Sequence, residues 1–431
     1  MRLRDTLTGA LRELEPGPDG TIGFYVCGPT VYDRIHVGNG RPVVVFLQMK
    51  RYLEWRGQRV RLVENITDIN DKIYAAANAR GVRSDELAAE MTRAFIADTD
   101  RLGLGRPDEE PLASATIPEI VALIEELVAG GHAYEAGGDV YFAVRSFDRY
   151  GELSGQRPDD VESGARVEPG EHKRDPVDFA LWKATKADED TSWPSPWGDG
   201  RPAWHIECSA MAEKLLGREF AVHGGGRDLI FPHHENEIAQ SCSIGRGFAR
   251  VWAHNGMLQL AGEKMSKSEG NIETLETALD TWGPETLIML FLQAHYASPL
   301  AYSDATLEQA RTACETLRNR LRTGAGEDAA VRGAVWEALD DDFSTPRALA
   351  ALFRAPPEAR DTVAEVLDVL GLGGLARSEA APAEVVELAE ARRAARERSD
   401  FPESDRLRDE IAALGWEVRD TAGGYELVRR G

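Results

Sequence analysis

The hydrophobic and polar positions near the start of the chain predict a parallel β-sheet. Residues 22–26 form an apolar run with the length of a buried strand, and residues 42–55 have apolar positions at helical spacing. A second strand pattern at 59–65 leads into a polar loop at 66–72. A strand, a helix and a strand over this length form a βαβ unit, from which α/β domains are built.

The same kind of pattern returns far along the chain. Residues 204–213 begin a helix, residues 220–226 form a strand that ends in glycines, and residues 251–255 form a last strand. The intervening segment, 111–203, is rich in loops with Pro, Gly and Asp clusters. We interpret this segment as an insertion between two halves of one sheet domain.

The pattern becomes helical beyond the sheet domain. Leu307, Ala310 and Leu317 belong to an apolar stripe that predicts a helical bundle. After a Pro- and Ala-rich linker at 373–383, a final helical segment carries a series of arginines: Arg392, Arg393, Arg396, Arg398, Arg406 and Arg408. These arginines form either a basic stripe for RNA or a solvated, salt-bridged helix, and the residue pattern by itself favours the second.

Composition and charge narrow the classes of function. The net charge of -23 argues against a general basic coat for nucleic acid. A local basic face stays compatible with it, because binding follows the distribution of charge. The N-terminus lacks the apolar core of a signal peptide, and no stretch approaches ~20 apolar residues. We therefore expect a cytoplasmic protein without a membrane segment.

Four potential metal ligands lie in distant segments. His233 and Glu237 are four residues apart in a predicted helix and share one face, while Cys27 and Cys208 lie at predicted strand or helix edges. Two thiolates, an imidazole and a carboxylate suit zinc, although their spacing matches no compact zinc finger. Buried cysteines beside a polar helix start are the alternative. Further donors nearby leave other ligand sets open: His205, Glu207, His223, His234 and His254.

A second group of residues suits a nucleotide. Gly28 forms a turn after the first strand, and His36, Gly38 and Asn39 lie where the following helix begins. At such a position, exposed N–H groups and the positive end of the helix dipole bind phosphate. A histidine there is often only a neighbour of the helix cap, so this signal is weak by itself.

Lys264 and Lys267 lie in a polar loop with a glycine at each end, residues 262–270. Such a loop is often a solvated turn. In an α/β chain that also has a phosphate site, the two cations would neutralise charge that develops on a departing pyrophosphate. This kind of clamp needs positioning and positive charge rather than an acid or a base.

Short motifs, taken in order, resemble the cysteinyl-tRNA synthetases, a family of class I aminoacyl-tRNA synthetases. They cover most of the chain: 25–33 (YVCGPTVYD), 36–39 (HVGN), 65–68 (NITD), 193–198 (WPSPWG), 200–209 (GRPAWHIECS), 223–226 (HGGG), 231–237 (FPHHENE), 264–268 (KMSKS) and 340–346 (DDDFSTP). The resemblance implies a Rossmann-like parallel-sheet catalytic domain split by an insertion, then a helical bundle and a small C-terminal domain.

The resemblance also implies a site for the substrate cysteine. It assigns one zinc ion per chain to the four donors named above: Cys27, Cys208, His233 and Glu237. The metal would bind the thiolate of the substrate, and a serine hydroxyl is a far poorer zinc ligand, so serine is rejected without editing. Thr67 and Trp204 would help form the cysteine pocket, and Asp228 would lie near the amino acid or the ribose.

The implied reaction ligates L-cysteine to the 3′ end of tRNA(Cys). ATP with Mg²⁺ would first give cysteinyl-adenylate and pyrophosphate, and the terminal ribose hydroxyl of the tRNA would then take the cysteinyl group. His36, Asn39 and Lys267 would stabilise the transition state, together with Lys264 in the same loop. The family signature often ends in His where this chain has Asn39, which donates a hydrogen bond without carrying charge. We expect a monomer.

The resemblance completes the predicted domain organisation: 1–110 and 204–255, the two halves of the catalytic domain; 111–203, the connective insertion; 256–303, the signature loop and stem-contact region; 304–372, a tRNA-binding helical bundle; 384–431, an anticodon-binding domain. Two alternatives stay open. A cysteine ligase that acts on an amino sugar would share the zinc and nucleotide residues but has no anticodon to read. A non-catalytic tRNA-binding relative would be expected to lose ligands or loop lysines, which are all present here.

Overall fold

The centre of the molecule is a four-stranded parallel sheet with the strand order β10-β9-β3-β4. Its strands are β3 (Thr21–Val26), β4 (Arg59–Glu64), β9 (Phe220–Gly226) and β10 (Ala249–Asn255). The structure, a computed structural model, describes all residues except 160–171, 261–262, 265–272, 378–380, 422–423 and 430–431. Val26 lies opposite Glu64 in the register of β3 and β4, so both strands end at the same edge of the sheet.

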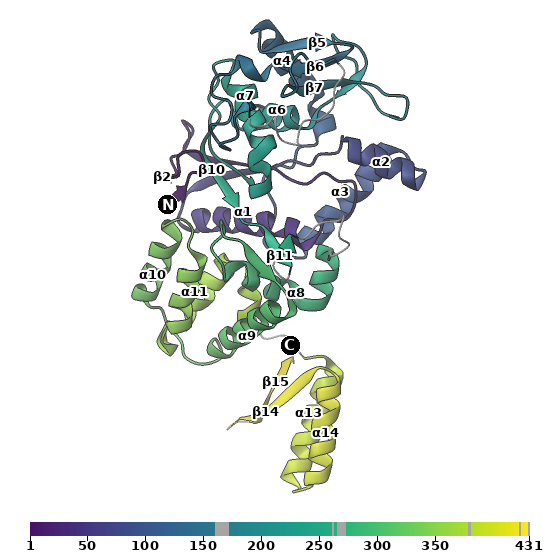
Figure 1. The fold of residues 1–431 in the computed structure, drawn as a ribbon. Coiled ribbons are helices and arrows are strands. Elements are labelled where there is room, and N and C mark those ends of the chain that lie inside the picture. Colours follow the sequence, from purple (N-terminus) through teal and green to yellow (C-terminus); the bar gives the residue numbers. More distant parts are fainter. Residues whose placement is uncertain (160–171, 261–262, 265–272, 378–380, 422–423, 430–431) are drawn as a thin grey trace.

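Helices cover both faces of the sheet (Figure 1). α1 (Val37–Trp55) lies on one face, and α6 (Trp204–Leu216) and α7 (Glu235–Cys242) lie on the other. Unlike a surface helix with one apolar stripe, α1 buries the whole run Val43–Met49. The reason is that the helical bundle packs against the side of α1 that faces away from the sheet.

The alternation of residues along β3 divides the hydrophobic core in two. Ile22, Phe24 and Val26 belong to the core between the sheet, α1 and the bundle. Tyr25 and Cys27 belong to the core between the sheet, α6 and the insertion. Because successive side chains of a strand point to opposite faces, the same period of two that forms the core also places Cys27 on the insertion side.

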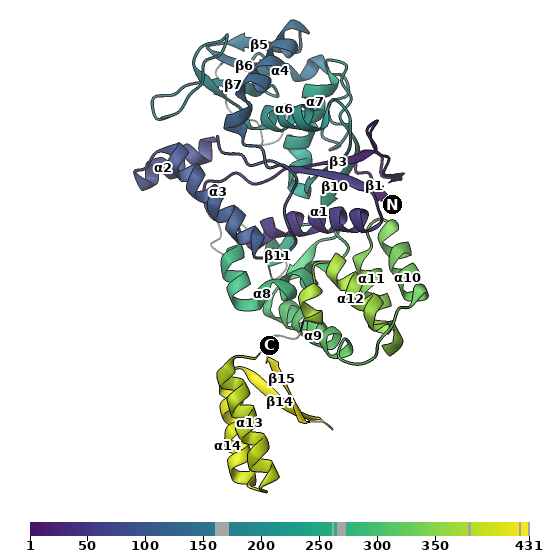
Figure 2. The same cartoon turned by 180° about the vertical axis from the view of Figure 1, so that it is seen from behind.

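The insertion forms a second, antiparallel sheet with the strand order β5-β6-β7-β8. Its elements are α4 (Ile117–Ala129), β5 (Ala133–Ala136), β6 (Asp139–Phe142), β7 (Phe179–Ala184) and β8 (Gly200–Pro202). Figure 2 shows a pair of helices that projects from the central sheet between the insertion and the bundle: α2 (Asp71–Arg80) and α3 (Ser84–Asp100).

A helical bundle follows the sheet domain, as predicted, although its first helix begins before residue 304. Its helices are α8 (Leu275–Leu292), α9 (Asp304–Arg320), α10 (Ala329–Asp340), α11 (Thr345–Arg354) and α12 (Arg360–Val369). Two small sheets complete this part of the molecule: β1 (Arg2–Arg4) with β2 (Leu11–Glu13), and β11 (Leu258–Leu260) with β12 (Glu263–Lys264) and β13 (Leu300–Tyr302).

The C-terminal domain stands apart from the bundle and has a small core of its own around Val385, Ile411 and Trp416 (Figure 1). Its elements are α13 (Ala383–Glu397), α14 (Phe401–Ala413), β14 (Trp416–Thr421) and β15 (Gly424–Arg429). Among the helices that the structure describes, none is both long and apolar enough to cross a bilayer.

Candidate active site

The four predicted metal ligands converge from three segments on the insertion side of the sheet. Cys27 directly follows β3, Cys208 lies in α6, His233 lies in a short π-helical turn before α7, and Glu237 lies in α7. All four are at least nine-tenths buried. The fold therefore brings together residues that are up to 210 positions apart in sequence.

The distances within this cluster fit one tetrahedral metal ion. Cys27 Sγ is 3.8 Å from Cys208 Sγ, 3.3 Å from His233 Nε2 and 3.5 Å from Glu237 Oε1. Zinc–sulfur bonds of roughly 2.3 Å place two sulfur ligands about 3.8 Å apart at a tetrahedral centre. Two thiols, an imidazole and a carboxylate form a soft set of donors. Such a set binds zinc in preference to magnesium or calcium.

Electrostatics also favour a cation at this position. Burial and the Cys208 thiol raise the pKa of the Cys27 thiol well above its usual value, and burial raises the pKa of the Glu237 carboxyl. Burial by itself would raise the pKa of Cys208, but Cys27 and His233 lower it to about 7. A divalent cation would supply the positive charge that the thiolates and carboxylate need when they ionise in this interior.

Two further histidines contact the same cluster. His223 Nε2 is 3.4 Å from Cys27 Sγ and 3.2 Å from Glu237 Oε2. His223 and His234 therefore form, with Cys27 and Glu237, a second potential ligand set that shares two members with the predicted one. The predicted set contains two sulfur donors instead of one, which makes it the better match to zinc.

A layer of aromatic and imidazole side chains surrounds the ligands. His205 Nδ1 lies 2.8 Å from His233 Nδ1, so His233 directs its other ring nitrogen at Cys27 and Glu237. The Trp204 ring stacks on the His233 ring at 4.2 Å between centroids. This contact ties Trp204, a predicted cysteine-pocket residue, directly to a predicted metal ligand.

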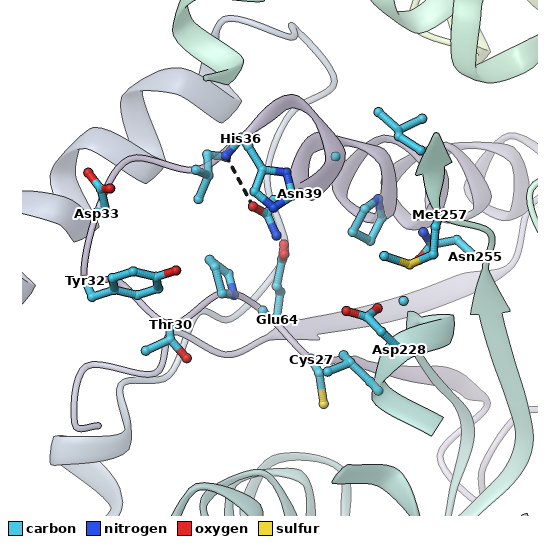
Figure 3. Close-up of a pocket in the computed structure, with 18 of the residues that line it drawn as sticks. Cys27, Thr30, Tyr32, Asp33, His36, Asn39, Glu64, Asp228, Asn255 and Met257 are labelled. Carbon is cyan, nitrogen blue, oxygen red and sulfur yellow. Dashed lines mark hydrogen bonds between the residues drawn. The ribbon is translucent and has the colours of Figure 1, made fainter. Parts of the chain in front are cut away.

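A cavity of about 360 Å³ adjoins the cluster at the carboxyl ends of the strands. Figure 3 shows that Cys27, His36, Asn39 and Asp228 line it, and Trp204 does so too. Ligands of open parallel sheets bind at this edge. One cavity thus contains predicted residues from both the metal group and the nucleotide group.

The start of α1 is shaped by glycine at the predicted phosphate site. A Cβ on Gly38 would lie 2.8 Å from His36 Nδ1, so only glycine lets the His36 ring lie against this turn. The Asn39 side chain accepts a hydrogen bond from the His36 N–H at 3.2 Å. Both contacts hold His36 and Asn39 at the cavity wall.

Gly28 and Thr67 both contact Asn65. A Cβ on Gly28 would overlap the Asn65 carbonyl oxygen, and the Gly28 N–H donates to Asn65 Oδ1 at 3.1 Å. That N–H is therefore engaged within the protein. Thr67 is fully buried, accepts a hydrogen bond from Asn65 Nδ2 at 3.2 Å and is not one of the cavity-lining residues.

The predicted signature-loop lysines are placed only in part. The backbone of Lys264 belongs to β12, which pairs with β11, and Leu258 of β11 lines the cavity. Lys267 lies outside the described residues, so its role stays a prediction.

Glu64, the last residue of β4, is 4% exposed and lines the cavity, although it was not among the predicted site residues. Burial, with a smaller contribution from Glu110, raises the pKa of Glu64 to about 8. Its position offered a signal, because a carboxylate that ends a parallel strand lies at the ligand-binding edge of the sheet.

Comparison with known proteins defines the class. The family model of class I (C) tRNA synthetase catalytic domains matches residues 13–312, and that of the cysteinyl-tRNA ligase anticodon-binding domain matches residues 378–426. The solved structure of Mycobacterium tuberculosis methionyl-tRNA synthetase with methionyl-adenylate shares the fold, with a TM-score of 0.60 at 16% identity over 84% of this chain and 86% of that one. These matches confirm the predicted architecture as that of a class I tRNA synthetase.

Full-length relatives define the family. The cysteine–tRNA ligase of Caldicellulosiruptor saccharolyticus is 43% identical over 464 residues, which span 100% of both chains. That of Halorhodospira halophila is 46% identical over 459 residues, which span 100% of this chain and 99% of that protein. The chain belongs to the cysteine–tRNA ligase family. Its exact domain boundaries and the roles of its site residues stay predictions.

Proposed function

We propose that this chain activates L-cysteine with ATP and ligates it to the 3′ end of tRNA(Cys). The observation that carries the proposal is the double position of Cys27, which belongs to the metal-ligand cluster and lines the cavity that contains His36 and Asn39. Selection of a thiol and activation of a carboxylate would then take place in one cavity.

We propose zinc for the cluster of Cys27, Cys208, His233 and Glu237. When bound, zinc would take the thiolate of the substrate cysteine as a ligand, for which a serine hydroxyl is a poor substitute. His205 fixes the tautomer and orientation of His233 through their 2.8 Å contact. Trp204, stacked on His233, covers the ligands on the side of the cavity.

The start of α1 supports a role in binding the phosphates of ATP. The first backbone N–H groups of a helix and its dipole attract an anion. Since Asn39 accepts from the His36 N–H through its oxygen, its amide nitrogen is left to donate to a phosphate oxygen. Mg²⁺ would accompany ATP, and Lys264 and Lys267 would neutralise the departing pyrophosphate.

The C-terminal domain would contact the tRNA, but its arginines are not a bare basic stripe. Arg392 and Arg396 pair with Asp420, and Arg406 pairs with Glu403 and Glu410. RNA phosphates would have to compete with these carboxylates for the arginines. Such competition suits an interface that contacts the bases of the tRNA as well as its phosphates. This pairing is the salt-bridged pattern that the sequence by itself favoured.

A pair of assays tests the proposed function. Zinc-loaded protein should catalyse cysteine-dependent exchange of pyrophosphate into ATP, and it should charge a tRNA(Cys) transcript with labelled cysteine. Transfer of cysteine to an amino sugar alone would replace the tRNA ligase with the amino-sugar ligase. Verified zinc-loaded protein without exchange would support a non-catalytic tRNA binder. We further propose a monomer, which sedimentation of the free protein would test.

A further inference from the structure

Glu64 ends β4 at the edge of the sheet and lines the cavity of about 360 Å³. Its side chain packs against Gly28, since a Cβ on that glycine would lie 3.2 Å from Glu64 Cγ. Gly28 directly follows the predicted zinc ligand Cys27. Figure 3 shows the Glu64 carboxyl pointing from β4 toward Asn39 at the start of α1. The carboxyl therefore lies between the residue proposed to hold the thiol and the residue proposed to hold a phosphate.

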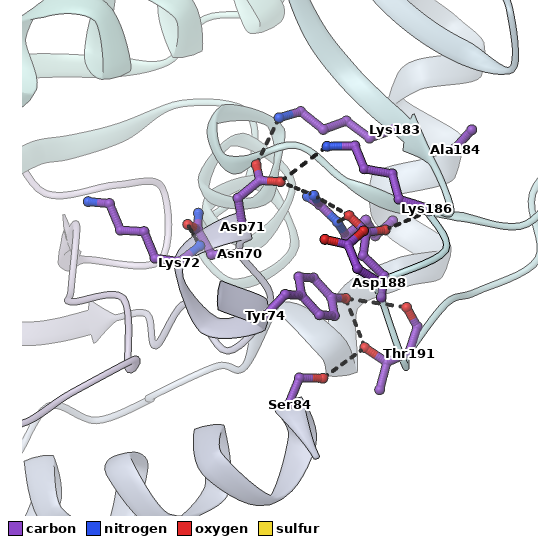
Figure 4. Close-up of polar contacts among 12 residues, drawn as sticks. Asn70, Asp71, Lys72, Tyr74, Ser84, Lys183, Ala184, Lys186, Asp188 and Thr191 are labelled. Atoms are coloured by element: carbon purple, nitrogen blue, oxygen red, sulfur yellow. Dashed lines mark hydrogen bonds and ion pairs between the residues drawn. The ribbon is translucent and has the colours of Figure 1, made fainter. Parts of the chain in front are cut away.

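The cations of the cavity wall do not pair with this carboxyl. Arg34 is held by two other carboxylates, at 3.1 Å and 2.8 Å. Figure 4 shows Lys72 pointing away from the polar group around Asp71, and Lys72 Nζ lies 5.5 Å from the centroid of the Tyr32 ring. Within the described residues, no group forms a hydrogen bond or an ion pair with the Glu64 carboxyl. The other titratable groups on the wall, besides Cys27 and Tyr32, are Asp33, His36 and Asp228.

The groups behind Glu64 also leave it without a counter-charge. Glu110 disfavours a negative charge on Glu64 and Arg106 favours one, but burial of the side chain, which is 4% exposed, outweighs both. Arg106 already pairs with Glu110 itself and with Asp100. The pKa of Glu64 is raised to about 8 as a result, so the carboxyl is protonated at neutral pH. A protonated carboxyl has one O–H group to donate.

The chemistry expected at this place accumulates negative charge. When the cysteine carboxylate attacks the α-phosphorus of ATP, the new P–O bond forms as the bond to the β-phosphate breaks, and pyrophosphate leaves without any proton transfer. The charge on the α-phosphate oxygens in the transition state is stabilised by hydrogen-bond donors that are already in place. An ionised carboxylate would oppose this charge, whereas a protonated one donates to it.

We propose that Glu64, in its protonated form, donates a hydrogen bond to the α-phosphate of ATP and keeps its proton throughout adenylation. This role rests on the proposed function, because it requires ATP in the cavity. Glu64 would act from β4, across the cavity from the donors at the start of α1. The alternative use of a carboxyl beside ATP is as a ligand of Mg²⁺, which requires the ionised form.

A shared proton would couple ATP binding to pH. An anion next to Glu64 raises its pKa further, so ATP bound above pH 8 should take up a proton, and ATP affinity should fall by up to about tenfold per pH unit. The phosphates of ATP do not obscure this uptake, because a terminal phosphate has released its second proton by about pH 6–7. Cysteine is left out of the binding measurement, since its thiol titrates near pH ~8.5.

The direct test is calorimetric titration of zinc-loaded protein with Mg²⁺–ATP at pH 8.5 in two buffers of different ionisation enthalpy. Wild type should take up about 0.7 proton per ATP, given a pKa of about 8 in the free protein. Glu64→Gln, which cannot titrate, should take up none. Glu109→Gln is the matched control and should behave as wild type, because the Glu109 side chain pairs with Arg61 and does not line the cavity.

Pyrophosphate exchange at saturating cysteine provides the kinetic test. Glu64→Leu should lower kcat/KM for ATP by roughly 10- to 150-fold at pH 7.5, the range for one hydrogen bond to a charged group, with zinc content and KM for cysteine unchanged. Glu64→Gln keeps an N–H donor and should recover most of this loss. Between pH 7.5 and 9.5, kcat/KM for ATP should fall roughly 25-fold more in wild type than in Glu64→Gln.

The outcomes separate this role from the proposed function. Equal proton uptake in wild type and Glu64→Gln, or the same alkaline decline in both, would show that Glu64 is not the donor even though adenylation proceeds. Proton release on ATP binding, or a higher Mg²⁺ requirement in Glu64→Gln, would make Glu64 a metal ligand and would also overturn the assignment. If wild type binds ATP with the expected uptake but shows no cysteine-dependent exchange, the proposed function fails while the Glu64 donor stands.

Discussion

Glu64 provides a quantitative test of the active-site electrostatics. Its carboxyl lines the cavity and is 4% exposed, and no hydrogen bond or ion pair is recorded for it within the described residues. Burial first, and then repulsion from Glu110, raise its pKa from 4.5 to about 8. The folded protein therefore keeps this carboxyl neutral at pH values where the unfolded chain has released the proton.

The sign of the effect follows from proton uptake on folding. Between the unfolded pKa of 4.5 and the folded pKa of about 8, the folded state binds the extra proton, so stability falls as the pH rises. Above both values the loss is complete. At roughly 1.4 kcal/mol per pH unit, the shift corresponds to about 5 kcal/mol.

Glu64→Gln keeps the shape of the side chain and removes the titration. We expect the stability of the variant relative to wild type to rise by about 4 kcal/mol between pH 5 and pH 8.5, because the wild type loses the stabilisation from its bound proton over this range and the variant has no such proton. Urea unfolding at a series of pH values, followed by tryptophan fluorescence, measures this difference.

Glu109→Gln is the matched control. The Glu109 carbonyl accepts a hydrogen bond from the Glu64 N–H at 3.0 Å, so the two residues are neighbours in space. The Glu109 side chain forms an exposed pair with Arg61 at 2.7 Å, so the substitution should change stability by less than ~1 kcal/mol at every pH. A stability difference between Glu64→Gln and wild type that stays constant from pH 5 to 8.5 would refute the buried, neutral carboxyl.

Three further substitutions test other parts of the molecule. Arg201→Met should destabilise the junction of α2 and the insertion by roughly 3–5 kcal/mol in urea unfolding, because Glu189, itself 3% exposed, loses a cation at 2.8 Å; an unchanged midpoint would mean that the pair is not buried in solution. Cys208→Ser should lower zinc content and cysteine affinity together, measured by metal analysis and calorimetry, and normal cysteine binding to verified metal-free protein would contradict the account. Lys267→Ala should slow pyrophosphate exchange more than it weakens cysteine binding, and unchanged exchange kinetics would exclude the pyrophosphate role.

The sequence predicted the architecture and the ligand cluster for a physical reason. Apolar runs in the sequence directly predict the strands of a buried parallel sheet. The strand period of two then determines which side of the sheet Cys27 faces. His233 and Glu237 share a face through a spacing of four, and the structure brings them within reach of Cys27 and Cys208, with all four ligand atoms within 4.8 Å of one another.

The features that the sequence did not predict arise from packing between distant segments. Thr67 is fully buried, accepts a hydrogen bond from Asn65 and is not one of the residues that line the cavity, so its place in the cysteine pocket stays a prediction. Glu64 owes its raised pKa to burial by neighbouring elements, which no local pattern reports.

The central claim is that the metal cluster selects cysteine through its thiolate. Replacement of the metal by cobalt(II) makes ligand exchange visible, because a new thiolate ligand changes the absorption of the ion. We expect one metal per chain and a new thiolate-to-cobalt absorption when L-cysteine is added, with no change on addition of L-serine. Cobalt-loaded protein that activates cysteine without this spectral change would contradict the claim.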